Sequence, residues 1–407
     1  MSMEGAMPHP SDPARADLPI PFVGDPPAEA AWLRAAALWP HGGASAALPP
    51  PCDPDRLAAV AVRHRLVPVL HGFMLARGVP PPPPLTDALR AAAVRTLRQT
   101  VLLARLMPAL EAAGVRALVL KGLPLSVQLY GHADLRSPGD IDILVAPDAV
   151  AAADHALTGL GCRLLADMPP ALELAMLDKE AVYRAPDGEV VELHWRLTRN
   201  RLLLRWDFDD LWAEAASVAL APGLTVRTLP STRLPVYLAL HGAHHAWARG
   251  RWLVDAALAL GTPDAADRAL DSARTDGLEP VVLHALLTAG MALGPPVADR
   301  HRAKALADPR VSALGRAVAR VAAVHAGAMT GGLSSWAGRR LAQIRLGLRL
   351  CPDRNTRMEE LRLLFASPAD RGFVQLPPRL GWLFPLLRPF LLALRLAGRN
   401  HPWRRRA

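Results

Sequence analysis

Residues 120–145 read LKGLPLSVQLYGHADLRSPGDIDILV, and this stretch decides the fold. Its first residue ends an apolar run, Arg116–Leu120, that predicts a buried strand, and its last residues, Ile141–Val145, predict another. The apolar spacing of Pro124–Tyr130 between them is helical. A strand, a short helix and a second strand in this order indicate an α/β region, the one clear α/β region of the chain.

The same pattern continues after residue 145. Pro147–Leu160 is predicted to be a helix and Cys162–Leu165 a strand. Two further strands, Ala181–Arg184 and Glu189–Trp195, are joined by an Ala-Pro-Asp-Gly segment, whose Asp-Gly pair favours a hairpin. Beyond residue 230 the chain reads as helices with short breaks. We therefore expect a small sheet with helical regions on either side of it in the sequence.

Two aspartates stand at the entry of the second strand. Asp140 and Asp142 flank Ile141, and side chains two residues apart on a strand share one face. Glu192 and His194 have the same spacing on the later strand VVELHW. If the two strands are neighbours, Glu192 joins the aspartates as a third carboxylate. The other interpretation is that Asp140 caps a turn and Glu192 is a solvated residue of an edge strand.

Three carboxylates a few ångströms apart repel one another, so this arrangement indicates bound cations. Mg²⁺ is the expected ion, with Mn²⁺ as the alternative, because hard carboxylate oxygens suit such ions. Two ions can bind the attacking and the leaving oxygens of a phosphoryl or nucleotidyl displacement. Asp140, Asp142 and Glu192 are therefore candidate metal ligands and catalytic residues.

The loop before these acids is suited to phosphate. The first strand ends directly in Lys121-Gly122 and a helix follows, so backbone N–H groups at the helix start can face an anion. Lys121, one of three lysines in the chain, adds a point charge. Arg136 is a second candidate phosphate contact. The alternatives are a tight turn with an exposed lysine, and an ion pair of Arg136 with Asp134 or Asp140.

His194 is a further candidate for the nucleotide site. Because it shares a strand face with Glu192, it can contact a phosphate or help to deprotonate an acceptor hydroxyl. A structural histidine that orients Glu192 is an equally good interpretation.

Three motifs in this order resemble a known family: residues 120–145, VELHWRL at 191–197 and LHGAHHAWARGRWLVD at 240–255. They resemble the uncharacterised nucleotidyltransferase family of bacterial proteins, within the DNA polymerase β-like superfamily. The resemblance implies two-metal catalysis by Asp140, Asp142 and Glu192, and an NTP held at Lys121 and Gly122. Better-known members have Gly-Ser in that loop, where this chain has Lys-Gly, so different phosphate contacts are expected.

On this resemblance we expect an α+β protein with a small mixed sheet as its nucleotidyltransferase core, N-terminal helices and a mostly helical C-terminal region. The predicted parts are a disordered tail (1–25), an N-terminal helical region (26–98), the core (99–230), a helical C-terminal domain (231–378) and a basic amphipathic tail (379–407).

A histidine cluster follows the core. His241 and His245 are four residues apart in a helical context, so they share a face, and with Asp255 they can form a transition-metal site. The segment lacks the glutamate of HExxH, so a metalloprotease is not indicated. Because matching histidines recur in the resembling family, His241, His245 and Asp255 are candidates for an acceptor pocket. Packing between helices and the sheet is the commoner role of such histidines.

The composition excludes extensive disorder, since 51% of the 407 residues are hydrophobic. Lys and Arg outnumber Asp and Glu by 47 to 37, and seven arginines lie between Arg379 and Arg406 without an acid. Because the rest of the chain is close to neutral, nucleic acid is not expected as a partner. The tail can dock its apolar face on the protein, which is the commoner arrangement, or make a peripheral membrane contact.

Cysteine usage and the absence of membrane signals bear on localisation. Cys52, Cys162 and Cys351 are far apart and indicate neither a disulfide framework nor a metal-binding pair, so we expect a reducing cytoplasm. The N-terminus lacks the pattern of a signal peptide, and no stretch reaches about 18 uninterrupted apolar residues. An integral membrane protein is therefore not expected.

The leading hypothesis is an enzyme that transfers an NMP from an NTP to an acceptor, such as a hydroxyl of a small molecule, peptide or protein, and releases pyrophosphate. The same carboxylates can also support phosphoryl transfer. A second hypothesis is a nucleotide-binding regulator or interaction protein without turnover. A third is a metal-dependent phosphohydrolase built on His241, His245 and Asp255.

Overall fold

The computed structural model describes residues 25, 27–39, 49, 52–137, 139–165, 178–294, 297–325, 332–365, 383, 387 and 390. The predicted disordered tail (1–25) lies outside these residues except for Asp25. The predicted basic tail (379–407) lies outside them except for Leu383, Leu387 and Phe390.

The chain forms two compact units, and neither is continuous in sequence. We call them the helical unit, from the described residues of Met1–Thr96, Leu125–Ser137 and Pro230–Pro352, and the sheet unit, from those of Leu97–Pro124, Pro138–Leu229 and Asp353–Ala407. The five-part division made from the sequence stays a prediction.

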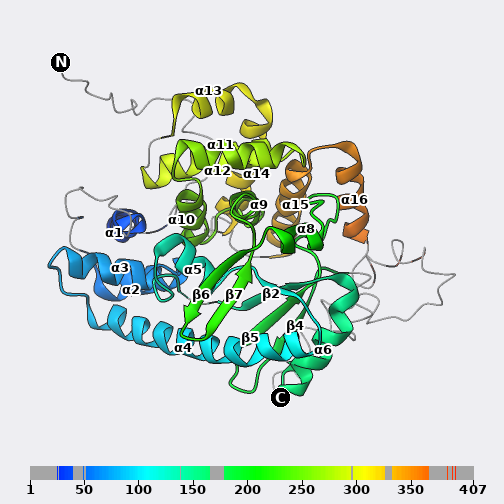
Figure 1. Cartoon of the computed structure of the whole chain (residues 1–407). Helices are drawn as coiled ribbons and strands as arrows, with labels where there is room; N and C mark the ends of the chain where they lie inside the picture. Colours follow the sequence, from blue (N-terminus) through cyan, green and yellow to red (C-terminus); the bar gives the residue numbers. More distant parts are fainter. Residues whose placement is uncertain are drawn as a thin grey trace. The chain divides into compact units, whose positions relative to one another are not determined.

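The sheet unit is built on a five-stranded sheet with the order β1-β2-β5-β4-β3 (Figure 1). The strands are β1 (Ala117–Val119), β2 (Ile141–Val145), β3 (Arg163–Leu164), β4 (Glu180–Arg184) and β5 (Val190–His194). The pair β2 and β5 is parallel and the other pairs are antiparallel. The predicted α+β class with a small mixed sheet is confirmed.

Burial fits the interior position of β2, between β1 and β5 in the sheet. All five residues of β2 and all three of β1 are buried, as expected for apolar strands covered on both faces. The hairpin between β4 and β5 turns at Gly188, whose φ of 87° favours glycine. The amide of Ala185 donates to the carbonyl of Glu189 and closes this turn. The predicted Asp-Gly hairpin is therefore present.

A second, two-stranded sheet belongs to the same unit and was not predicted in full. It pairs β6 (Ala216–Ala221) with β7 (Leu224–Thr228) in antiparallel fashion (Figure 1). The helices of the sheet unit are the later part of α4 (Pro83–Ala112), α6 (Val150–Gly159), α8 (Phe208–Ala213) and α16 (Arg354–Phe365), with a 3₁₀ turn at Pro147–Ala149. Asn200 ties α16 to the sheet unit, because its Nδ2 donates to the carbonyl of Thr356 at 2.9 Å.

The helical unit contains most of the helices of the described chain (Figure 1). They are α1 (Pro27–Ala37), α2 (Pro54–His64), α3 (Val67–Ala76), the first part of α4, most of α5 (Leu123–Tyr130), α9 (Leu234–His244), α10 (Gly250–Ala259), α11 (Pro263–Arg274), α12 (Glu279–Leu293), α13 (Asp299–Ala307), α14 (Pro309–His325) and α15 (Gly332–Leu350).

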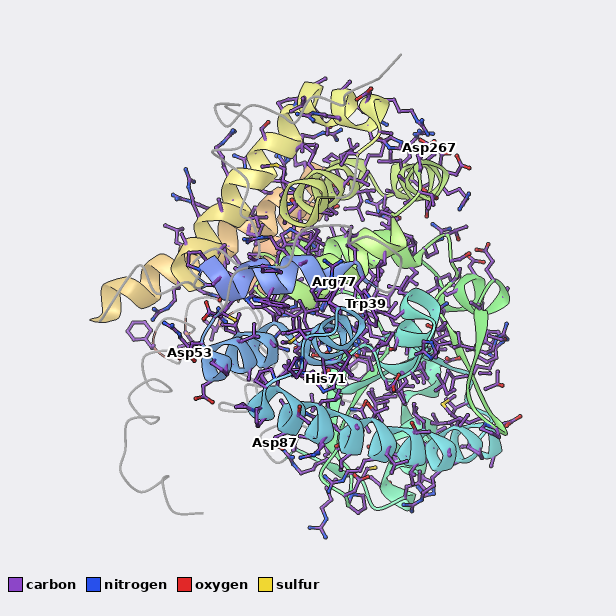
Figure 2. The ribbon with its side chains drawn as sticks, turned by 90° about the vertical axis from the view of Figure 1, so that its left-hand side faces the viewer. Trp39, Asp53, His71, Arg77, Asp87 and Asp267 are labelled. Atoms are coloured by element: carbon purple, nitrogen blue, oxygen red, sulfur yellow. The ribbon has the colours of Figure 1, made fainter. Side chains whose placement is uncertain are left out.

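Aromatic side chains pack between the helices of this unit. Gly72 of α3 lies against Trp39, labelled in Figure 2, and a Cβ there would come within 2.7 Å of the indole. Trp32 and Phe73 meet edge to face at 6.1 Å between centroids. Trp247 is fully buried and donates to Nε2 of His284 at 3.3 Å. These contacts hold α1 on α3, and α9 on α12.

Among the described residues, no helix combines the length and the apolarity needed to cross a bilayer.

Candidate active site

The sheet topology brings two of the predicted acids face to face. In the parallel pair of β2 and β5, Asp142 lies directly opposite Glu192, and Leu144 lies opposite His194. Because side chains alternate along a strand, Asp142, Glu192 and His194 share one face of the sheet. The condition stated from the sequence, that the two strands be neighbours, is met.

These three side chains form a compact group with ligand atoms in each member. One oxygen of Asp142, one of Glu192 and one nitrogen of His194 all lie within 4.8 Å of one another. Nε2 of His194 is 3.3 Å from Oδ1 of Asp142 and 3.4 Å from Oε2 of Glu192. Asp142 and His194 are buried, whereas Glu192 is 22% exposed and gives the group an opening to solvent.

Lys121 completes the group from the loop after β1. Its Nζ lies 3.0 Å from Oδ1 of Asp142, and its side chain is 14% exposed. The amide of Leu120 donates to the carbonyl of Asp142 at 3.0 Å, which holds the start of this loop against β2. Gly122 follows with a φ of 73°, a conformation that favours glycine. The Lys-Gly loop therefore lies beside the carboxylates, and the lysine contacts one of them.

Asp140 lies close enough to act on Glu192 through its charge, but it is not one of the three residues whose ligand atoms lie together. It is half-buried and directly precedes β2. A Cβ on Gly122 would lie 3.9 Å from the carbonyl oxygen of Asp140, which places the loop beside the entry of β2. Buried Gln99 of α4 donates to the carbonyl of Gly139 and, at 3.0 Å, to Oε2 of Glu189. Gln99 thus fixes the backbone just before Asp140.

Glu180 is a member of the site that sequence reasoning missed. It lies opposite His194 in the antiparallel pair of β4 and β5, and its Oε2 is 3.1 Å from Nδ1 of His194. Its own partner is Lys179, with which it forms an ion pair. In an antiparallel hairpin, residues at equal distances from the turn are paired. The predicted turn between β4 and β5 would therefore have paired Glu180 with His194, so this neighbour could have been found from the sequence.

The electrostatics of the group are those of crowded acids. Burial favours the neutral form of Asp142, but Lys121 and His194 outweigh it and hold the pKa of this carboxyl below its usual range. Burial raises the pKa of Glu192, and the charges of Asp142, Glu180 and Asp140 raise it further, against the contact with His194. Burial alone would lower the pKa of His194, yet the neighbouring carboxylates of Asp142 and Glu192 raise it.

The group has the chemistry of a cation site. Oδ1 of Asp142 and both ring nitrogens of His194 are buried and lack a well-directed hydrogen bond within the described chain. Unsatisfied buried polar atoms are rare in folded proteins and call for a ligand or another explanation. Two carboxylates suit Mg²⁺ or Mn²⁺, while the imidazole adds a ligand typical of transition metals. The residues present therefore fit a divalent cation.

Arg136 and Asp255 form a separate cluster in the helical unit. Nε of Arg136 lies 3.1 and 3.0 Å from the two carboxylate oxygens of Asp255, and a terminal nitrogen lies 3.0 Å from Oδ2. Tyr130 donates to Oδ1 of Asp255 at 2.8 Å. Both members of the ion pair are at least 97% buried. The predicted phosphate contact of Arg136 stays a prediction, and the structure pairs Arg136 with Asp255.

The histidine cluster also belongs to the helical unit. The rings of His241 and His245 are 4.7 Å apart, and His245 stacks on Trp252 at 4.8 Å. Asp255 is occupied by Arg136 and Tyr130, and within the described chain the group of three close metal-ligand atoms is that of Asp142, Glu192 and His194. The phosphohydrolase hypothesis needed His241, His245 and Asp255 together, and the described geometry does not support it. The acceptor-pocket role of the three residues stays a prediction.

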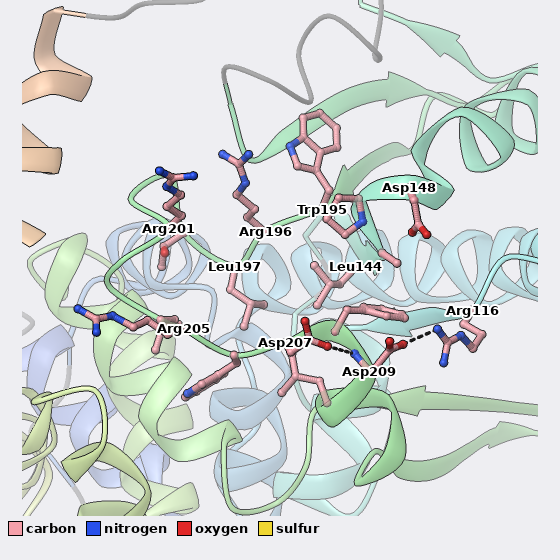
Figure 3. Close-up of a pocket in the computed structure, with 17 residues that line it drawn as sticks. Arg116, Leu144, Asp148, Trp195, Arg196, Leu197, Arg201, Arg205, Asp207 and Asp209 are labelled. Atoms are coloured by element: carbon pink, nitrogen blue, oxygen red, sulfur yellow. Dashed lines mark hydrogen bonds and ion pairs between the residues drawn. The ribbon is translucent and has the colours of Figure 1, made fainter.

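A cavity of about 460 Å³ opens where the chain leaves β2 and β5, a size typical of small-molecule sites. Leu144 of β2 and Trp195, which follows β5, line it, and four arginines and three aspartates share its wall. Figure 3 shows Arg116 directed at Asp209, with which it forms an ion pair, while Arg196 and Arg201 extend on the other side of the view.

Comparison with protein families decides the class of the protein. The sequence profile of a family described as uncharacterised nucleotidyltransferases matches residues 50–301, more than half of the chain. The chain belongs to this family. The matched range contains all the residues predicted for the site of this nucleotidyltransferase. Membership implies transferase chemistry with an NTP substrate, and nucleotidyltransferases generally use divalent metals. No curated protein matches the chain.

Proposed function

We propose that this chain transfers an NMP from an NTP to an acceptor hydroxyl and releases pyrophosphate, with divalent cations held by Asp140, Asp142 and Glu192. The observation that carries the proposal is the group of Asp142, Glu192 and His194 on two adjacent parallel strands beside the Lys121-Gly122 loop. An excess of carboxylates beside a glycine loop suits a cation and a polyphosphate together.

Each residue has a role in this proposal. Mg²⁺ or Mn²⁺, when bound, neutralises the phosphate oxygens and stabilises the charge that develops during displacement. Asp142 and Glu192 would supply its ligands from within the sheet, and Asp140 would supply one from the position directly before β2. Lys121 and the backbone of Gly122 bind the triphosphate. His194 holds Asp142 and Glu192 in place and is held in turn by Glu180.

The acceptor is a hydroxyl of a small molecule, peptide or protein. A cytoplasmic location is part of the proposal, in keeping with the free thiols of Cys52, Cys162 and Cys351.

The test is transfer of label from α-³²P NTPs, each supplied singly with Mg²⁺ or Mn²⁺, to acceptors in a lysate. We expect labelled product with wild type and a loss of roughly 10³-fold with Asp142→Asn, the size found when one electrostatic partner of a transition state is removed. Asp210→Asn, an exposed acid on α8, is the matched control and should keep full transfer.

Two outcomes would contradict the proposal. Label from γ-³²P in place of α-³²P would show phosphoryl transfer by the same carboxylates. NTP binding without any transfer, unaffected by Glu192→Gln, would show a nucleotide-binding regulator.

A further inference from the structure

Lys121 occupies a place that a bound cation needs. Its Nζ is 3.0 Å from Oδ1 of Asp142, an atom that belongs to the carboxylates of the three-residue ligand group. The Asp142 side chain is 3% exposed, so water screens this contact poorly. Two positive charges that share a buried carboxylate oxygen repel each other strongly. A divalent cation on Oδ1 of Asp142 and the ammonium of Lys121 in its present position therefore compete for the same oxygen.

The Lys121–Asp142 contact has the properties of an exchangeable pair. Oδ1 of Asp142 accepts no well-directed hydrogen bond within the described chain, although Lys121 is within ion-pair distance. Lysine carries a compact charge on a flexible four-carbon stem, whereas arginine gives the rigid, bidentate geometry suited to permanent buried pairs. The basic residues of this chain, 47 in all, are arginines except at Lys121, Lys179 and Lys304. The cation paired with Asp142 is therefore a flexible lysine, Lys121, which can move away from its partner.

We propose that Lys121 gates the metal site: it neutralises Asp142 in the empty enzyme and moves to the triphosphate when an NTP binds, which frees Asp142 for the cation. The inference rests on the proposed function, because it needs both a metal and an NTP at this site. Coupling of this kind is reciprocal, so the NTP strengthens cation binding by the same factor as the cation strengthens NTP binding. The gate also prevents the empty site from holding a metal tightly.

The test measures binding of Mn²⁺ alone to the full chain by electron paramagnetic resonance, without nucleotide. We expect wild type to bind weakly and Lys121→Met to bind about 10-fold or more tightly, because the competing charge is gone. Lys121→Gln serves as a second variant that keeps a neutral hydrogen-bond donor, in case the methionine variant does not fold. Mn²⁺ should also raise the melting temperature of both variants more than that of wild type.

Two matched control variants each remove one lysine charge at a position other than Lys121. Lys179→Met removes the lysine paired with Glu180, beside the site but not on Asp142, and Lys304→Met removes the lysine paired with Glu279 in the helical unit. We expect a much smaller gain in Mn²⁺ affinity from Lys179→Met and none from Lys304→Met. If Lys121→Met, Lys179→Met and Lys304→Met all raised the Mn²⁺ affinity equally, the effect would come from the net charge of the protein, and the proposed gate would be wrong.

Asp142→Asn separates failure of the gate from failure of the site. If wild type and Lys121→Met bind Mn²⁺ equally well and Asp142→Asn does not bind it, the gate is wrong and the metal site stands. If neither wild type nor any lysine variant shows Mn²⁺ binding that depends on Asp142, the proposed two-metal function fails with it.

Discussion

Asp142 in the sheet unit and Asp255 in the helical unit are both buried carboxylates beside a cation, and their bonding differs. Both carboxylate oxygens of Asp255 accept hydrogen bonds from Nε of Arg136, at 3.0 and 3.1 Å. One of these oxygens also accepts a hydrogen bond from the hydroxyl of Tyr130 at 2.8 Å. Asp142 has Lys121 at 3.0 Å and His194 at 3.3 Å, with Oδ1 lacking a well-directed bond.

The difference separates a structural ion pair from a binding site. A buried carboxylate whose oxygens all accept hydrogen bonds is not stabilised further by a ligand. A buried carboxylate with an oxygen that lacks a hydrogen bond is stabilised when a ligand binds to it. The same contrast holds for histidine. In the helical unit, Nδ1 of His64 accepts from the amide of Gly250 at 2.9 Å and its Nε2 lies 2.7 Å from Asp25. Within the described chain, the ring nitrogens of His194 have only longer contacts, 3.1 to 3.4 Å from the carboxylates of Glu180, Asp142 and Glu192, and none of these is a well-directed hydrogen bond.

The largest expected effect is on the free energy of unfolding when Asp255, and for comparison Asp142, is replaced by asparagine. Asp255→Asn leaves Arg136 buried without its charge partner, so the free energy of unfolding should fall by about 3–5 kcal/mol. Asp142→Asn should lower it by less than Asp255→Asn does, because Lys121 is 14% exposed and can turn to solvent, and because one acid that repels Glu192 is removed. Urea unfolding at pH 7 measures both. Equal losses would mean that Asp142 is a structural residue like Asp255.

The next effect concerns pH and the helical unit. Burial, and then the charge of Arg63, lower the pKa of His64 from 6.5 to about 4. Below pH 6.5 the unfolded chain binds this proton first, so the stability contributed by neutral His64 is present above pH 6.5 and is lost as the pH falls to 4. The loss should reach about 3 kcal/mol. His284, whose pKa burial also lowers to about 4, acts with the same sign.

Unfolding of wild type and His64→Gln between pH 7 and 4 tests this assignment. The variant starts less stable at pH 7 but should lose about 3 kcal/mol less on acidification. Parallel curves would show that His64 is protonated in the folded state. The raised pKa of His194 has the opposite sign: its contribution is present below pH 6.5 and is lost as the pH rises above it.

The smallest expected effect removes one hydroxyl from the satisfied cluster. Tyr130→Phe deletes the bond to Asp255 and leaves the Arg136 bonds in place, so stability should fall by about 1–2 kcal/mol. Tyr183→Phe, which deletes a hydroxyl bond to the less buried Asp154 in the sheet unit, is the matched control and should cost less. A larger loss in the control would show that burial of the carboxylate does not set the strength of these bonds.

Local patterns explain how much the sequence predicted. The bounds of β2, Ile141–Val145, were predicted because a buried strand has a continuous apolar pattern. The shared face of Glu192 and His194 follows from strand alternation. β6 was missed because its sequence, ASVALA, is rich in alanine, which is depleted in strands. It forms through pairing with β7, a tertiary effect that outweighs propensity.

The partners of charged residues were not predictable in the same way. The sequence placed Lys121 beside the acids but not on Asp142, because a pattern gives the position of a charge and not the opposite charge that it meets. Asp255 was named as a candidate third ligand beside His241 and His245, in the motif that resembles the family. Its contact with Arg136 spans 119 residues, which local spacing does not encode.

That span has a consequence for how the protein is made. The loop that leads to Asp140 ends in Arg136 and Ser137, and the helical unit holds both through α10: Asp255 binds Arg136, and Arg251 donates to the carbonyl of Ser137 at 2.5 Å. At the usual pace of translation the ribosome adds these partners on the order of 10 s after Arg136. During that time β2 has already been synthesised, but the partners that hold the chain just before it, Asp255 and Arg251, have not.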